Sequence, residues 1–470
     1  MAFIIGIILL LTFFGLAYYC IKGYNLMIGF LVITLIWTIL PLVGTLFVGQ
    51  DFLNANEVLK FGANQVLSDG TTRKLVDILN GIYQSAPEGW GTTLVNVCWG
   101  AWFGRVLMDT GIASTLIRKT VELGGDKPII TIALLNIVTC LIFTSMTGAG
   151  PVIAIGVIVL PILFSLGVPK PIALFSFMGS VAAGIYLNPV NFAQYRAFFL
   201  TTDQMPDFTL GWYAAHWGYA ALIIMLIVTT VLTGVYLARA KRSHAWAAQT
   251  RNPQAAQKDA PLYTLILPIV PVILNIAFNF SVIGGFVIAG FAALFLCGRM
   301  KGTFKENCQL VNKLYYDGVV DTAPLVGFLL TLPMFNSVAK YASPYFNVVI
   351  GDFMPRSELV VCIVFAALIF MGLFRGPMTL VGCGAATLGV LMNVAKFSIP
   401  FLYAIFAIPT ITVNIGSCIT QSWVAWGLAY SKVESKDFLK LSIPNAYVTG
   451  ILQYIAVYVL LGGLGAAWYL

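Results

Sequence analysis

The chain has 470 residues, of which 59% are hydrophobic and only 9% are charged. A soluble domain carries about 25% charged residues, and no soluble fold of this size hides so much apolar surface. With a mean hydropathy of +0.91, the composition excludes soluble enzymes and nucleic-acid-binding proteins despite the net charge of +8. The sequence therefore predicts a chain that crosses a bilayer many times.

Apolar segments of sufficient length follow one another along the whole chain. Ten are predicted to be full passes: 2–21, 24–49, 92–111, 171–191, 209–238, 262–280, 282–299, 323–342, 399–430 and 441–467. Two others, 128–168 and 358–396, each have two short apolar arms around a Gly/Pro-rich centre, which predicts re-entrant hairpins. We expect 112–127 and 300–322 to be interfacial helices and 50–91 to be a polar external loop.

The polar linker 239–261 sets the predicted orientation, because basic residues concentrate in cytoplasmic loops. Threading outward from it places 17 basic residues in cytoplasmic segments and seven outside, while Arg105 and Arg375 stay within spans. The reversed orientation would exchange the first two numbers. We therefore expect a multi-pass protein of a cell membrane, the bacterial inner membrane in the first instance, with a cytoplasmic linker, a retained first span and both chain ends outside.

The order of these segments predicts two inverted repeats. Residues 1–238 contain three passes, the hairpin 128–168, the broken pass 171–191 and a final pass. Residues 262–470 repeat this order in the opposite orientation, with the hairpin 358–396 and the broken pass 399–430. The predicted fold class is an all-α polytopic membrane protein with two inverted-topology repeats, each of five transmembrane helices plus one re-entrant hairpin, and with broken helices at the midplane.

Two Gly-Pro pairs at the hairpin centres, 150–151 and 376–377, lie 226 residues apart. The same offset places Asn188 on Asn414, and each Asn follows its proline by 37 residues. Proline at 189 and at 409 is expected to interrupt the two passes that carry these residues. Four half-helix ends are then predicted to meet, where N-terminal amides suit anions and unwound carbonyls suit Na⁺.

Small and polar residues of these four segments are the candidate ligands. Those predicted to bind substrate are Ser145, Thr147, Gly148, Gly150, Asn188, Asn191, Arg375, Gly376, Thr379, Asn414 and Ser417. Those also predicted to bind a coupling ion are Thr147, Asn188, Thr379 and Asn414. The alternative interpretation is that such residues only promote close helix packing, as they often do in membrane proteins.

Arg375 places a charge at predicted membrane depth, which costs about 2.5–3.5 kcal/mol on insertion scales and is functional by default. No Asp or Glu occurs in 128–191 or 359–430 to neutralise it. A substrate carboxylate fits the planar guanidinium, whereas the alternative is a structural cap on hairpin carbonyls. The lack of acids in these segments also favours Na⁺ over H⁺ coupling, although a protonated substrate leaves H⁺ open.

The remaining charged residues within or beside the spans are given structural roles. Arg105 and Asp109 lie four residues apart and are expected to pair on one helix face. Asp321 and Lys340 are expected at the membrane interfaces, and Arg196 is either an external funnel residue or a snorkelling cation. Because the chain has two His and scattered Cys, the sequence predicts no metal site other than Na⁺ and no cofactor.

The hairpins, broken passes and repeat order resemble the ion transporter superfamily of elevator-type carriers. The stretches GRVLMDTGIASTLIRKTVELGG (104–125) and GPVIAIGVIVLPILFSLGVPKPIAL (150–174) are similar to its gluconate permease and citrate symporter branches. Its divalent-anion branch has Ser-Asn-Thr triplets at both hairpin tips, where this chain has Ser-Met-Thr at 145–147 and Arg-Gly-Pro-Met-Thr at 375–379. The resemblance implies an organic-anion substrate and a homodimer with a static scaffold and a moving transport domain.

The predicted function is a secondary active transporter, not an enzyme. It is expected to move a small carboxylate, such as a sugar acid, citrate or a dicarboxylate, by an elevator mechanism coupled to Na⁺ or H⁺. Its predicted partners are this anion, the lipid bilayer and a second copy of the chain, with no nucleic acid. The alternative is a Na⁺/H⁺ antiporter of related architecture, which needs a buried acid in the broken passes.

Overall fold

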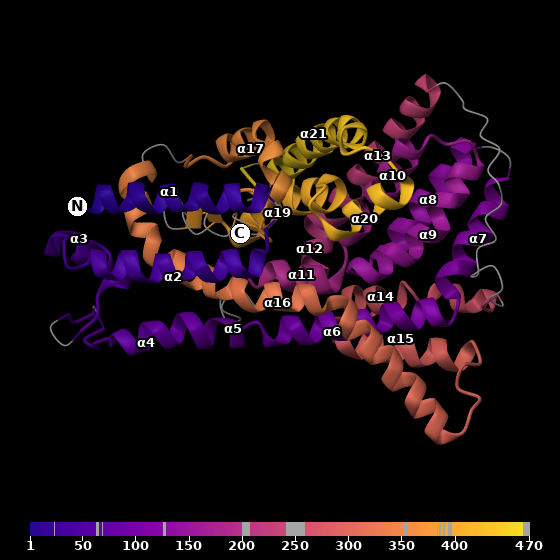
Figure 1. The fold of residues 1–470 in the computed structure, drawn as a ribbon, viewed down its shortest axis with the longest axis horizontal. Coiled ribbons are helices and arrows are strands. Elements are labelled where there is room, and N and C mark those ends of the chain that lie inside the picture. Colours follow the sequence, from indigo (N-terminus) through magenta and orange to yellow (C-terminus); the bar gives the residue numbers. More distant parts are fainter. Residues whose placement is uncertain are drawn as a thin grey trace.

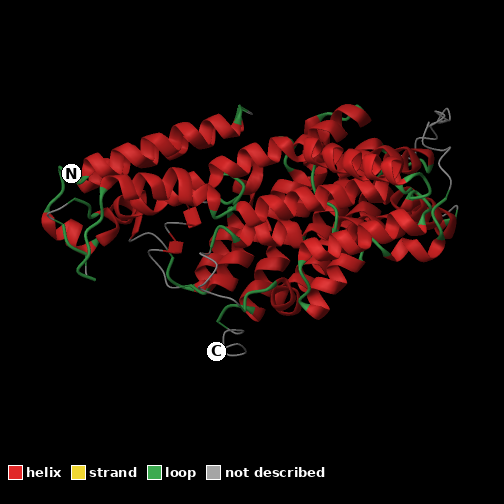
Figure 2. Ribbon diagram, turned by 90° about the horizontal axis from the view of Figure 1, so that it is seen from below, coloured by secondary structure: helices red, strands yellow, loops and turns green. Residues whose placement is uncertain are grey.

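The computed structural model describes residues 1–463 apart from 23, 63, 64, 68, 126, 127, 200–206, 241–258, 352–354, 383, 385, 386, 389, 390 and 393–396. Most of the predicted linker and most of the second arm of the second hairpin therefore lie outside the described residues. The described part is helical (Figure 2), and its only paired extended residues are Val66 and Thr72 in an isolated bridge.

The first half of the chain contains helices that lie side by side in an elongated molecule (Figure 1). Their bounds are α1 (Ala2–Ile21), α2 (Leu26–Gly44), α3 (Gln50–Ala55), α4 (Leu75–Asn80), α5 (Ala86–Glu88), α6 (Gly91–Asp109), α7 (Ile112–Gly124), α8 (Pro128–Phe143), α9 (Ala149–Ser165), α10 (Lys170–Ile185), α11 (Pro189–Arg196), α12 (Leu210–Tyr213) and α13 (Tyr219–Arg239). The stretch 50–91, predicted to be a polar loop, thus contains short helices that lead into α6.

The second half follows after the linker. Its helices are η5 (Leu262–Ile266), α14 (Val270–Phe278), α15 (Val282–Leu296), α16 (Phe304–Ile350), α17 (Glu358–Ala367), η7 (Ile369–Arg375), α19 (Ile399–Ile408), η8 (Pro409–Ile415), α20 (Ser422–Ser431) and α21 (Ser435–Leu460). The π-helical turn η8 continues α19, and η7 continues α17 after a bend of 62°.

The helix α16 corrects one prediction. It is continuous over 47 residues, so 300–322 and 323–342 are not a separate interfacial helix and a separate pass. A capping box begins it, because Thr303 and Glu306 each bind the backbone N–H of the other. It packs along α6, α2 and α1 (Figure 1). The change from polar to apolar composition near residue 323 requires no break in the backbone, which is why it misplaced the boundary.

The apolar helices fit a helical membrane protein. Among the described residues, three are long and apolar enough to cross a membrane, namely Met27–Gly44, Leu210–Arg239 and Ser435–Leu460. The bent pairs α10 with α11 and α17 with η7 raise the number to five if each pair is one span. Because shorter apolar helices account for much of the rest, the ten full passes stay a prediction.

The centre of the molecule is formed by α10 and by α19 with η8. All residues of α10 from Ile172 to Ile185 are buried, and so are all residues of α19 and η8 from Pro400 to Ile415. Helices that are apolar on every side belong in the interior of a bundle. α10 contacts α8, α13, α21 and η8, so the segments that carry most of the predicted ligands are anchored in the core.

Candidate functional site

The first half-site, residues 143–150 and 188–191, lies where the chain bends by 67° between α10 and α11. Asn188 is the N-cap of α11, and its Oδ1 accepts hydrogen bonds from the backbone N–H of Val190 (3.0 Å) and Asn191 (3.2 Å). The first amides of a helix have no partner within the helix, so a carboxamide before a proline is well suited to this position.

The same side chain ties the bend to the turn between α8 and α9. Nδ2 of Asn188 donates to the backbone carbonyls of Phe143 and Met146, both at 3.1 Å. A carboxamide has two N–H donors and an oxygen that accepts two hydrogen bonds, so these four contacts use its full capacity. Asn188 is also completely buried. In this conformation it positions the half-site, and it has no capacity left for the substrate or ion contacts predicted for it.

Thr147 and Asn191 are the polar side chains at the edge of the first half-site. Oγ1 of Thr147 donates to Oδ1 of Asn191 (2.9 Å), and Nδ2 of Asn191 donates to the hydroxyl of Tyr195 (3.3 Å). Gly148 has a φ of +97°, which an L side chain rarely adopts, and it turns the chain into α9. Ser145 is buried and donates back to a carbonyl of α8 (3.3 Å), so it lies apart from this pair.

The second half-site, residues 371–381 and 410–421, is built in a related way. The backbone carbonyl of Gly372 accepts hydrogen bonds from Oγ1 of Thr379 (2.8 Å) and from Nδ2 of Asn414 (3.4 Å). Both side chains are fully buried. The predicted substrate glycine Gly376 is buried in the same turn, where a Cβ would overlap a backbone carbonyl of η7. Asn414 thus connects a helix of the core to the hairpin turn, as Asn188 does.

The second broken pass differs from the prediction at its proline. α19 continues through Pro409 as η8, and the chain leaves helical geometry only at 418–421. A π-helical turn relaxes the spacing of backbone hydrogen bonds, so it accommodates proline without a break. Ser417 donates to the backbone carbonyl of Ser442 (3.4 Å) in α21, so the structure does not direct this predicted ligand toward the hairpin.

Arg375 ends η7 at the turn of the second hairpin. Arg375 and Phe374 have φ values of +57° and +54°, a strained conformation that persists only where the surroundings hold it. The partly buried guanidinium donates to the backbone carbonyl of Val381 (3.5 Å) and to Oε1 of Gln421 (3.4 Å). Gln421 in turn donates to Oδ1 of Asn414. The guanidinium is therefore connected through Gln421, which sequence reasoning missed, to the Asn of the helix.

The hydrogen bonds of the two half-sites obey one numerical relation. Asn188 donates to the carbonyl of Met146, and Asn414 donates to the carbonyl of Gly372. The two Asn lie 226 residues apart, and so do the two residues whose carbonyls they bind. This is the offset of the Gly-Pro pairs, so the same side-chain contact occurs at equivalent positions of the two halves.

The two half-sites are joined through Tyr186 and Thr412. Their hydroxyls lie 2.7 Å apart, and both donate to Oε1 of Gln453 (3.1 and 2.8 Å). Tyr186 and Thr412 are themselves 226 residues apart in the sequence. Where two repeats are related by a two-fold axis, equivalent residues contact each other only near that axis. The structure thus places the predicted segments in two hydrogen-bonded pairs, with this contact between them.

Two ion pairs correct the predicted pairing of Arg105 with Asp109. Nε and Nη2 of Arg105 donate to the carboxylate oxygens of Asp321 on α16 at 2.6 and 2.5 Å. Asp109 instead accepts two hydrogen bonds of 2.8 Å from Arg299, which raise the pKa of that guanidinium. Both pairs have the planar two-pronged geometry that a partner on another helix supplies. The side chain of Asp321, predicted to be interfacial, is only 16% exposed.

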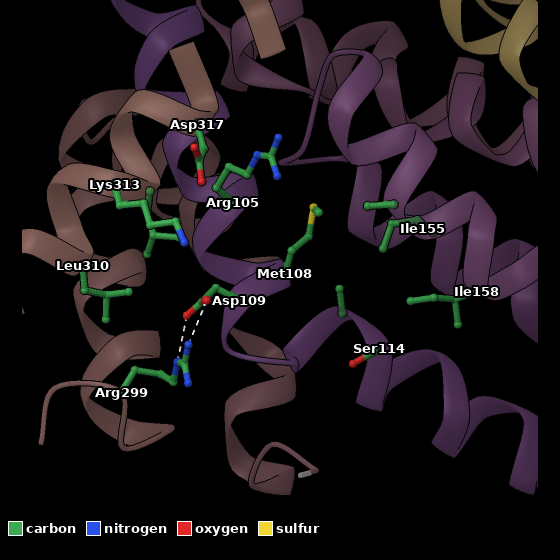
Figure 3. A pocket seen from close by; sticks show the side chains of 13 residues that line it. Arg105, Met108, Asp109, Ser114, Ile155, Ile158, Arg299, Leu310, Lys313 and Asp317 are labelled. Carbon is green, nitrogen blue, oxygen red and sulfur yellow. Dashed lines mark hydrogen bonds and ion pairs between the residues drawn. The ribbon is translucent and has the colours of Figure 1, made fainter. Parts of the chain in front are cut away.

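A cavity of about 290 Å³, the Arg299 cavity, lies beside the C-terminal end of α6. Its charged lining stands on one side, and Ile155 and Ile158 of α9 stand on the other (Figure 3). The charged residues that line it are Arg105, Asp109, Arg299, Lys313 and Asp317.

A second cavity of about 300 Å³, the Arg196 cavity, lies at the other end of α6. It is lined by Thr92 and Thr93 near the start of α6 and by Pro189 and Arg196 of α11. Because Thr93 and Arg105 lie twelve residues apart on α6, the two cavities are separated by about 18 Å along the helix. The first half-site lies between them, since Gly100 of α6 faces α11 and Gly104 faces the start of α9.

Comparison with known proteins gives one relevant likeness. No protein-family model and no curated protein matches the sequence. Among solved structures, the chain is similar to the YdaH transporter of Alcanivorax borkumensis, which is described as having an unusual topology. The two chains share 16% sequence identity with a TM-score of 0.58, over 93% of this chain and 98% of that chain.

The chain has the fold of a membrane transporter. At 16% identity the likeness carries the fold over nearly the whole length and no residue-level role. The named superfamily, its gluconate and citrate branches and the elevator mechanism stay predictions.

Proposed function

We propose that this protein is a secondary active transporter that moves a small organic anion, a carboxylate, across a membrane by an elevator mechanism. The observation that carries the proposal is the pair of equivalent half-sites. In each, an Asn of a core helix binds a backbone carbonyl of a hairpin turn at the same offset of 226 residues. Inverted repeats that place such turns together are how many secondary transporters form one substrate site.

The residues proposed to reach the anion are those that keep polar groups at the edges of the half-sites. In the first half-site these are Thr147 and Asn191 with the backbone at Gly148. In the second they are Arg375 and Gln421, whose partly buried guanidinium supplies the positive charge. A planar guanidinium binds a carboxylate with two parallel hydrogen bonds, which favours a carboxylate over other anions.

One observation keeps the Na⁺/H⁺ antiporter as a second candidate. Such a protein needs a buried acid near the broken helices, and Asp321 of α16 lies against Gly150 of the first hairpin. Its carboxylate is held by Arg105, however, which stabilises the ionised form and provides no site for a second cation. We therefore place carboxylate transport first.

The experiment that tests the proposal is uptake into proteoliposomes from a panel of labelled sugar acids, citrate and dicarboxylates. We expect concentrative uptake of at least one of these carboxylates. The control is the same protein in liposomes made permeable by an ionophore, which should show no accumulation. Na⁺/H⁺ exchange without uptake of any carboxylate would favour the antiporter.

Uptake is expected to rise with external Na⁺. The hydroxyl and amide oxygens of Thr147, Thr379 and Asn414, together with nearby carbonyls, are hard ligands suited to this ion. Uptake is measured with an imposed Na⁺ gradient and, separately, with a pH gradient in sodium-free medium. Equal uptake under the two conditions would contradict Na⁺ coupling.

The proposed orientation and the inverted repeats predict the sidedness of two labels. A single cysteine at Gln254, in the linker, should react with an impermeant reagent only from the cytoplasm, and one at Asn64 only from outside. Both positions lie outside the described residues. Reaction of the two cysteines from the same side of the membrane would contradict the topology. We propose further that the protein is a homodimer in a bacterial inner membrane, as the family resemblance implies.

A further inference from the structure

Asp321 separates the first half-site from the Arg299 cavity. Its carboxylate contacts Gly150 in the first turn of α9 so closely that a Cβ on Gly150 would overlap it. The next residue, Thr322, lies 3.8 Å from the position that a Cβ of Gly148 would occupy. α16 therefore closes directly on the turn that carries Thr147. The N-terminal end of α9 has a partial positive charge, which suits a carboxylate in this place.

Arg105 holds Asp321 against the turn. The two parallel hydrogen bonds of 2.5 and 2.6 Å fix the orientation of the carboxylate. The preceding residue, Gly104, lies against Pro151, with 3.2 Å between the position of a Cβ and the proline ring, so α6 also approaches α9 here. Arg105 lines the Arg299 cavity as well. One guanidinium thus belongs both to the cavity and to the contact that closes it.

The other charges of the cavity lie nearer its mouth than this pair. Asp317 and Lys313 precede Asp321 by one and two helical turns on the same face of α16, and both line the cavity. The pair of Asp109 with Arg299 lies at the end of α6 (Figure 3). The Arg105 guanidinium is therefore the first cation that an anion meets on leaving the half-site in this direction.

We propose that the Arg105–Asp321 pair is the gate between the first half-site and the Arg299 cavity. When it opens, the guanidinium of Arg105 binds a carboxylate of the transported anion in place of Asp321. The exchange is chemically even, because one carboxylate replaces another on the same two-pronged donor. The inference rests on the proposed function and orientation, which make the Arg299 cavity cytoplasmic. The gate is closed in this structure.

The gate is tested without any substrate by the accessibility of residue 147. In a protein whose eight native cysteines are replaced, Thr147→Cys is exposed to an anionic, impermeant methanethiosulfonate from the cytoplasmic side of inside-out vesicles. With Asp321 present the reaction should be slow, and Asp321→Asn should speed it at least tenfold. Arg105→Gln removes the other partner and should act in the same direction. Equal rates with and without the pair would overturn the gate.

Matched controls separate gating from a general loss of structure. Asp109→Asn breaks a second bidentate pair in the same cavity and should leave the rate at residue 147 within twofold. Ser114→Cys, which lines the cavity, should react equally fast with and without Asp321 and only from the cytoplasmic side. The exchange Arg105→Asp with Asp321→Arg should restore the slow rate. Faster reaction in the Asp109→Asn variant, or reaction of Ser114→Cys only from outside, would overturn the proposal.

The role of Arg105 toward carboxylates has its own arm. Citrate, gluconate and succinate, each at 10 mM, are added to the Asp321→Asn variant that carries Thr147→Cys. At least one should slow labelling several-fold, and the effect should disappear when Arg105→Gln is added. Protection by none of them, or equal protection without Arg105, would overturn this assignment. Because the gate itself is read without ligand, a failure of the proposed carboxylate transport leaves the first result independent.

Discussion

Replacing Asn188 by alanine is expected to abolish uptake and to lower the melting temperature of the purified protein. The substitution removes four buried hydrogen bonds that join α11 to the turn after α8. A hydrogen bond contributes about 0.5–1.5 kcal/mol, and a buried partner left unsatisfied costs about 1–3 kcal/mol. We therefore expect a loss of several kcal/mol, measured by thermal unfolding in detergent alongside uptake in proteoliposomes.

Asn414→Ala is the matched control for this prediction, because Asn414 occupies the equivalent position with weaker contacts. It donates to Gly372 at 3.4 Å and accepts from Gln421, so it retains one donor for other partners. Its removal should lower the melting temperature less than that of Asn188, yet it should still reduce uptake. A variant Asn188→Ala with the melting temperature of the wild type would show that the four bonds do not hold the half-site.

Arg375→Ala is expected to lose carboxylate uptake while the protein remains folded. The guanidinium lies at a hairpin turn whose counterpart in the first half, Ala149, carries no charge, so the repeat itself does not require an Arg there. Removal of one partner of a charge-assisted hydrogen bond costs about 1.5–3 kcal/mol, which is a loss of affinity of roughly 10- to 150-fold. Arg375→Lys should recover only part of it, because an ammonium lacks the two-pronged geometry.

The competing interpretation is that Arg375 only caps the hairpin, as its hydrogen bond to the carbonyl of Val381 allows. Substrate affinity and melting temperature measured on the same purified variants separate the two roles. A cap predicts a lower melting temperature with unchanged affinity in the molecules that remain folded. That outcome would remove Arg375 from the substrate site.

Local features of the site follow directly from the sequence. An Asn before a Pro predicts an N-cap and a helix start, and the structure has both at Asn188. The Gly residues before Pro151 predict a turn, and Gly148 has the positive φ that such a turn needs. These signals span a few residues, and the side chain and the backbone that it binds lie close together in the chain.

Contacts between distant segments were beyond reach. Arg105 and Asp321 are 216 residues apart, and no pattern around either residue indicates that α6 and α16 run side by side. The sequence therefore offered Asp109, the nearest acid, as the partner of Arg105. For the same reason Asn188 appeared to be a ligand, since its two longer-range bonds to Phe143 and Met146 are visible only in the folded chain.

The proline at 409 shows a different limit. The same residue type predicts a break at 189 and at 409, yet only the first coincides with a sharp bend. At 409 a π-helical turn absorbs the missing N–H, and the fully buried surroundings hold the helix straight enough to continue to Ile415. Packing decides between the two outcomes, and packing is a property of the whole fold.

The most direct measurement is an experimental structure of the protein with a transported carboxylate bound. We predict density for the carboxylate between the two half-sites, with one of its groups within hydrogen-bond distance of the Arg375 guanidinium and another near Thr147 and Asn191. The side chain of Asn188 should remain on its four backbone partners. Density for the anion elsewhere, with Arg375 still on Val381 and Gln421, would contradict the site and the pairing of the repeats on which it depends.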